Sequence, residues 1–263
     1  MRAIWLCAIS AATLFAQANP RDLVRESIRN GEQSWRRSFD YYCIKRDVDR
    51  EFDSGHRVKS VSDDVYEVIP LGFSTSFDKL IRHNNEPVSR DRRLKAEEEL
   101  RARQQEAPDA KRRRFDKQLS ERSYMKEVAD AFDFRITGEE QLPTGPAWVL
   151  EATPRPGYQP RSRYAHMFPK MRGRLWIDKK DRQWVKADAV AADTVTFGFF
   201  IARLAKGSHI RIEQMRLPDG DWVAKRITAA ASARTFVFFN HNFEEDITYS
   251  DYSRTPPSLS AAK

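Results

Sequence analysis

The sequence predicts an α+β domain in which a strongly curved antiparallel β-sheet, a half-barrel, wraps over an N-terminal helix and carries an inserted charged helical segment. Three observations lead to this prediction. Residues 173–252 read as consecutive strands with period-two alternation, joined by tight turns. Residues 19–39 carry apolar side chains at helical spacing. Residues 89–118 are rich in charge and poor in large apolar side chains.

The composition limits the class of protein. The chain has 263 residues, 40% hydrophobic and 11% aromatic, which is enough for a packed core in one large domain or two small ones. Its formal net charge is +8. Nucleic acid is the usual candidate partner of a basic chain, but the export signal described next argues against it. We therefore expect the positive charge to meet an anionic membrane surface, lipopolysaccharide or an acidic envelope protein.

The first eighteen residues have the features of a cleaved signal peptide. Arg2 gives a basic start, residues 3–15 are an apolar run too short for a stable membrane anchor, and Ala16 and Ala18 are the small residues that a signal peptidase reads. We expect cleavage after Ala18, a soluble periplasmic domain over residues 19–255, and a disordered tail over residues 256–263.

Cleavage would leave one cysteine in the mature chain. Cys7 lies in the signal, so Cys43 would remain alone, and no internal disulfide could form. Because no histidine is close to it in the sequence, we interpret Cys43 as a structural thiol.

The mature chain begins with a helix. Asn19 is a good N-cap, and Pro20 is tolerated at the first helical position because its missing N–H group would have no partner there. We expect one apolar stripe of this helix to pack on the sheet. It consists of Val24, Ile28, Trp35 and Phe39.

Strands follow the helix. Residues 39–52 switch to period two, which places Tyr42, Ile44 and Val48 on one face and Cys43, Lys45 and Asp47 on the other. Residues 53–56 predict a hairpin turn, and residues 57–69 and 75–83 predict further strands.

The charged segment comes next, as a helical insertion over residues 89–132. Residues 89–118 hold eleven Lys and Arg against seven Asp and Glu. Ser89 predicts a helix start, and Pro108 separates two helical pieces. Two interpretations stay open: a solvated excursion between strands, or a basic arm that contacts an anionic surface. Met125, Val128 and Phe132 predict that the end of the insertion docks on the core.

The remaining segments complete the sheet. Residues 134–137 and 147–153 predict strands around a turn region at 138–146, and the prolines of residues 154–164 predict an irregular rim loop. Residues 195–204 are the most apolar stretch of the mature chain. They predict either a strand buried on both faces or a short plug in the open side of the sheet.

No catalytic pattern stands out. The five histidines lack metal-ligand spacing, and the sequence has no nucleophile elbow, phosphate loop or dinucleotide fingerprint. Glu139 with Glu140, and residues 244–246, are adjacent carboxylates that alternate between faces of a strand, so we interpret them as solvated edges. We expect a protein that is not an enzyme and that has no cofactor and no metal.

Several segments together resemble one family. They are the signal peptide, the leading helix, the strand with Tyr41 and Tyr42, the strand GRLWID at residues 173–178 with its charged turn, and the segments LAKGS at 204–208 and DGDW at 219–222. The chain resembles the LolA/LolB-like periplasmic lipoprotein carriers. The resemblance implies an open half-barrel over helices with an apolar concave face that takes acyl chains. Residues 89–118 depart from the compact carrier pattern.

Two functional hypotheses follow, and an assembled hydrolase site is a residual third. In the first, a monomer holds a lipid or an acylated protein on one apolar face, composed of Tyr42, Ile44, Leu175, Ile177, Ile210, Ile212, Phe236 and Phe238. In the second, the half-barrel is filled and an envelope sensor meets an anionic partner. That contact would use Lys111, Arg112, Arg113, Arg114, Arg161 and Arg163.

Overall fold

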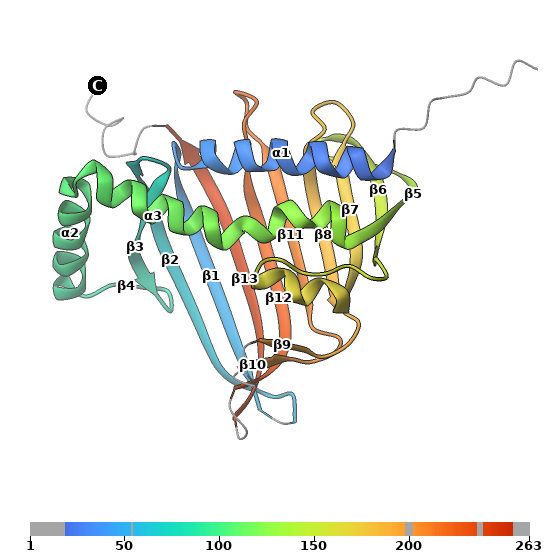
Figure 1. Ribbon diagram of the computed structural model, residues 1–263. Coiled ribbons are helices and arrows are strands. Elements are labelled where there is room, and N and C mark those ends of the chain that lie inside the picture. Colours follow the sequence, from blue (N-terminus) through green and yellow to red (C-terminus); the bar gives the residue numbers. More distant parts are fainter. Residues whose placement is uncertain (1–18, 54, 198–201, 236–238, 255–263) are drawn as a thin grey trace, which may run out of the picture.

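A computed structural model describes residues 19–53, 55–197, 202–235 and 239–254 of the chain. The described residues form one open, curved antiparallel sheet with helices across one of its faces, an α+β half-barrel (Figure 1). The predicted fold class is therefore confirmed. The expected signal peptide and tail lie outside the described residues.

The sheet joins strands from both halves of the chain. Its order is β4-β3-β2-β1-β13-β12-β11-β8-β7-β6-β5, and β10 pairs with both β12 and β9. Because β4 and β5 lie at opposite ends of this order, the sheet is not closed. The strands are β1 Tyr42–Phe52, β2 Val58–Gly72, β3 Thr75–His83, β4 Glu86–Pro87, β5 Phe132–Leu142, β6 Gly145–Pro154, β7 Met171–Asp178, β8 Trp184–Ala191, β9 Val195–Phe197, β10 Ala202–Leu204, β11 His209–Arg216, β12 Trp222–Thr235 and β13 Phe239–Ser253.

Helix α1 (Pro20–Ser38) covers one face of the sheet, which we call the inner face. The Asn19 side chain caps it as predicted, accepting the Arg21 N–H at 3.0 Å. Leu23 and Val24 are buried against Leu150 and Ile177 of the sheet. This contact anchors the first half of α1 over β6 and β7.

The charged insertion forms two helices, α2 (Arg90–Gln105) and α3 (Pro108–Glu121). Ser89 caps α2, and Pro108 is the first residue of α3, so the predicted division is confirmed. The chain continues through the 3-10 helix η1 (Arg122–Glu127) and the short helix α4 (Val128–Ala131). Figure 1 shows α3 and η1 beside α1 on the inner face, and α2 at the side of the sheet near β3.

Two expectations need correction. The predicted turn region at 138–146 is mostly strand, since β5 and β6 pair from Phe132↔Pro154 to Leu142↔Gly145 and leave only residues 143–144 for the turn. The apolar stretch 195–204 is not one buried strand, because its described ends form two short strands, β9 and β10, that pair with each other. Residues 198–201 lie outside the described part.

Candidate binding groove

Three adjoining cavities lie between the inner face and the helices, and together we call them the groove. Tyr124 of η1 lines all three, so the cavities meet at this side chain. The 3-10 helix η2 (Tyr164–Lys170) supplies Met167 to two of them. We refer to them as the apolar cavity, of about 260 Å³, the central cavity, of about 360 Å³, and the rim cavity, of about 410 Å³.

The apolar cavity is lined almost entirely by hydrocarbon and aromatic side chains. Its floor is formed by small and branched residues of β7, β8 and β11, and its wall by η1, α4 and η2. Ile210 remains 37% exposed there, so this part of the inner face is not sealed by the helices. The main apolar lining residues are Met125, Val128, Phe132, Phe134, Met167, Phe168, Leu175, Ala187, Ala189, Ile210 and Ile212.

The central cavity is mixed in polarity. Trp184 and Ile212 line it on the side of the apolar cavity, and Cys43 and Lys45 of β1 line it on the other. Burial raises the pKa of the Cys43 thiol to about 12, which keeps the sulfur protonated. Lys45 Nζ donates to Asp78 at 2.5 Å, so this lysine already has a carboxylate partner.

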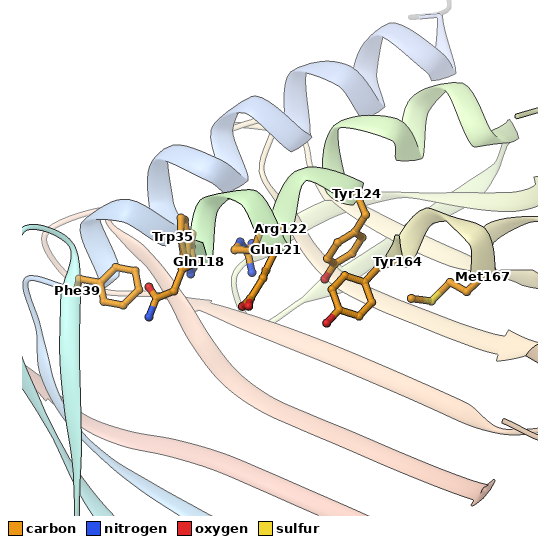
Figure 2. Close-up of a pocket in the computed structure, with 8 residues that line it drawn as sticks. All are labelled: Trp35, Phe39, Gln118, Glu121, Arg122, Tyr124, Tyr164 and Met167. Atoms are coloured by element: carbon orange, nitrogen blue, oxygen red, sulfur yellow. The ribbon is translucent and has the colours of Figure 1, made fainter. Parts of the chain in front are cut away.

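Figure 2 shows the rim cavity, where side chains of α1, α3, η1 and η2 form one row above the sheet. Arg122 lies in this row between Trp35 and Tyr124, and the Arg122 Cζ is 4.5 Å from the Trp35 ring centroid. The full lining is Trp35, Phe39, Gln118, Glu121, Arg122, Tyr124, Tyr164 and Met167.

The predicted apolar face is only partly assembled. Leu175, Ile210 and Ile212 line the apolar cavity. Ile177 lies on the same face but is completely buried under α1, so it belongs to the core. Phe236 and Phe238 lie outside the described residues.

Placing Tyr42 and Ile44 on this face was wrong. Cys43 and Lys45 line the central cavity, and since side chains alternate along a strand, Tyr42 and Ile44 point to the outer face. The Tyr42 hydroxyl there donates to Glu67 at 3.2 Å. The inner side of β1 therefore carries the polar set of residues.

The predicted basic contact surface is also reduced. Lys111 is only 8% exposed, and its Nζ donates to the carbonyl oxygens of Gln104 at 2.9 Å and Leu71 at 3.2 Å. It ties α3 to the end of α2 and to β2, and is not a surface residue. Arg114 makes two hydrogen bonds of 2.8 Å with Glu106. Both side chains are used inside the insertion.

The remaining basic residues lie at the surface. Arg112 and Arg113 are exposed on α3. Arg161 pairs with Asp130 at 3.3 Å while its side chain stays 68% exposed, and Arg163 lies over the Tyr164 ring. A contact with an anionic partner stays a prediction for these four positions.

Sequence reasoning missed a buried carboxylate that holds the groove wall. Glu127 of η1 is 4% exposed and accepts hydrogen bonds from the Tyr158 hydroxyl at 2.6 Å and from the backbone N–H groups of Arg161 and Ser162 at 2.9 Å. Burial alone would raise the Glu127 pKa, but these hydrogen bonds lower it to about 2. The ionised side chain fixes the loop before η2 to η1. In the sequence Glu127 is one of several charged residues in this segment, beside Lys126 and Asp130, so no signal distinguishes it.

A row of carboxylates follows the inner face beyond Lys45, and we call it the acidic strip. Asp47 of β1 pairs in register with Asp64 of β2, and Asp49 pairs with Glu245 of β13. Burial and the neighbouring carboxylates Asp49 and Asp64 raise the Asp47 pKa, and burial raises that of Glu245 in the same way. The inner face thus changes from apolar on β7, β8 and β11 to acidic on β1, β2 and β13.

Within the described ranges, no group of His, Cys, Asp or Glu could hold a metal ion. None of the helices in the described part has the length and hydropathy needed to span a bilayer.

The comparisons with known proteins concern the fold. No family model and no curated protein matches the chain. Among solved structures it is similar to a LolA superfamily protein from Nitrosomonas europaea, with 11% identity over 94% of this chain and 98% of the other and a TM-score of 0.31. It is also similar to a DUF1329 family protein from Desulfovibrio piger, with 14% identity over 89% and 92% and a TM-score of 0.30. A third match is MucB in complex with MucA(peri), with 11% identity over 88% and 94% and a TM-score of 0.25.

Proposed function

We propose that the chain is an exported, periplasmic binding protein that holds an acyl chain, from a lipid or an acylated protein, in the groove. The observation that carries this proposal is the apolar cavity of about 260 Å³, which is lined by hydrocarbon side chains and leaves Ile210 37% exposed. Apolar surface kept open to solvent in this way favours an apolar ligand.

The size of the cavity suits part of a lipid chain. The apolar and central cavities share Tyr124, Met125, Trp184 and Ile212, so a chain could extend from one into the other. Each methylene moved out of water contributes about 0.8 kcal/mol. Eight buried methylenes would then supply about 6 kcal/mol before the costs of association.

Ile210 provides the sharpest test of this proposal. Replacing it by Asn should weaken binding of a fluorescent long-chain acyl probe by about tenfold or more, while the urea midpoint changes little because the side chain is already partly exposed. The matched control is Val61→Asn on β2, whose side chain is 48% exposed. This change should alter neither probe binding nor stability.

Two results would contradict the proposal. A native protein that binds no acyl probe and carries no lipid by native mass spectrometry would not be an acyl carrier. Equal losses of binding and stability in Ile210→Asn would mean that Ile210 serves only as core.

A further inference from the structure

Arg122 is a cation placed inside the groove. It begins η1, its guanidinium lies over the Trp35 ring, and it lines both the rim cavity and the central cavity. Trp35, Phe39 and Tyr124 surround this position with aromatic surface. A charge in such a place is desolvated, and burial lowers the Arg122 pKa.

The guanidinium forms no salt bridge with any of the described residues. Glu32 attracts it from beyond salt-bridge distance, and Glu121 lines the rim cavity beside it. Neighbouring arginines differ, since Arg36 pairs with Glu32 at 2.9 Å and Arg114 pairs with Glu106. A desolvated charge without a partner is costly unless something else binds it.

Gln118 adds a second unsatisfied group to the same cavity. It lies one helical turn before Arg122 and lines the rim cavity with it. Its side-chain oxygen is buried and has no hydrogen-bond partner in the described part of the chain. The other end of the same amide carries two N–H donors, which can bind an oxyanion beside Arg122.

We propose that Arg122, with Gln118 beside it, binds the oxyanion headgroup of an amphiphile whose acyl chain lies in the apolar cavity. The inference rests on the proposed function and adds the charge of the ligand to it. Arginine matches carboxylate and phosphate oxygens equally well through its planar fork of donors, so the headgroup is a carboxylate or a phosphate.

The cavities connect the two ends of such a ligand. The central cavity is lined by Arg122 together with Met125, Trp184 and Ile212, and these last three also line the apolar cavity. A chain in the apolar cavity can therefore end at Arg122 without crossing the core.

The test compares probes that share one tail and differ in headgroup: decanoate, decyl phosphate, decanol and decyltrimethylammonium. Affinities would be measured by displacement of a fluorescent acyl probe, below micelle-forming concentrations and at low salt. Because a hydrogen bond to a charged group contributes more than a neutral one, both anionic probes should bind at least about tenfold tighter than decanol.

The variants assign that preference to one side chain. Arg122→Gln should lose the preference for anions and keep its affinity for decanol, and Arg122→Lys should keep most of the preference. Arg29→Gln is the control, because Arg29 is an exposed arginine of α1 that lines none of the three cavities. This variant should behave like the wild-type protein.

The outcomes separate this inference from the proposed function. If no probe binds, both fail. If decanol binds as tightly as the anions, or if a folded Arg122→Gln protein keeps the anion preference, only the inference about Arg122 is overturned. Tightest binding of decyltrimethylammonium would also overturn it, in favour of the acidic strip. The headgroup comparison on the wild-type protein decides the question even if Arg122→Gln does not fold.

Discussion

The replacement Glu127→Gln tests how the wall of the groove is held. The carboxylate accepts three hydrogen bonds from the loop before η2, and Gln keeps the size of the side chain but loses the charge and one acceptor. The loop leads directly to η2, whose Met167 and Phe168 line the apolar cavity. Loosening this contact should therefore affect both stability and acyl binding.

The size of the effect follows from the Glu127 pKa. It falls from an ordinary 4.5 to about 2 in the folded protein, and one pKa unit corresponds to about 1.4 kcal/mol, so the ionised form contributes about 3 kcal/mol to the free energy of unfolding. Because the folded-state pKa is the lower one, this contribution is fully present above about pH 5. It is lost as the pH falls from there toward about 2.

Urea unfolding of wild type and variant at pH 7 and at pH 3 measures this effect. At pH 7 Glu127→Gln should cost about 2–4 kcal/mol, and the difference from wild type should shrink at pH 3. Glu121→Gln is the control, because Glu121 is exposed and its replacement should stay within about 0.5 kcal/mol. A cost no larger than that of the control, or one that is equal at both pH values, would refute the reasoning.

Three further predictions concern the groove. Gly31→Ala places a Cβ 2.3 Å from Trp184 Nε1, so an overpacking cost of about 1–3 kcal/mol should outweigh the helix-propensity gain of about 1 kcal/mol and lower the urea midpoint. In a Trp184→Leu background the same change should stabilise the protein, and a Gly31→Ala single variant more stable than wild type would contradict the packing. Asp47→Asn should raise the free energy of unfolding at pH 7 by up to about 1 kcal/mol, because burial and the carboxylates Asp49 and Asp64 disfavour the charged form of Asp47. The gain should vanish as the pH falls below the raised Asp47 pKa, and a variant less stable than wild type at pH 7 would count against the acidic strip. The Cys43 thiol, buried and with its pKa raised to about 12, should resist alkylation at pH 8 until the protein is unfolded, and rapid labelling of the native protein would show that Cys43 is accessible.

Period-two alternation in the sequence correctly predicted which side chains face inward on strands whose inner face is buried. The alternation of β7 correctly separated Leu175 and Ile177 from Trp176, because α1 and the wall of the groove cover the inner face there. The same rule failed for β1. There the inner face is polar, so the apolar residues Tyr42 and Ile44 mark the outer face. Apolar alternation indicates which residues share a face, and it identifies the inner one only where that face is covered.

The candidate site was harder to predict, because its polar groups meet across long separations in the chain. Glu127 is held by a loop more than thirty residues further on. Arg122 lies over Trp35, which belongs to a different helix. In the sequence each is one charge among many, and only the packing of η1 between α1 and η2 brings them into the groove.

The order of polarity along the inner face determines how a ligand can lie. The apolar cavity is at the side of β7, β8 and β11, and the acidic strip is at the side of β1, β2 and β13. Arg122 lines the central cavity between these two regions. An acyl chain gains free energy only toward the apolar side, and an anionic headgroup is repelled by Asp47 and Glu245 beyond Lys45. Both effects place the headgroup at Arg122, so the proposed ligand has a single favoured orientation.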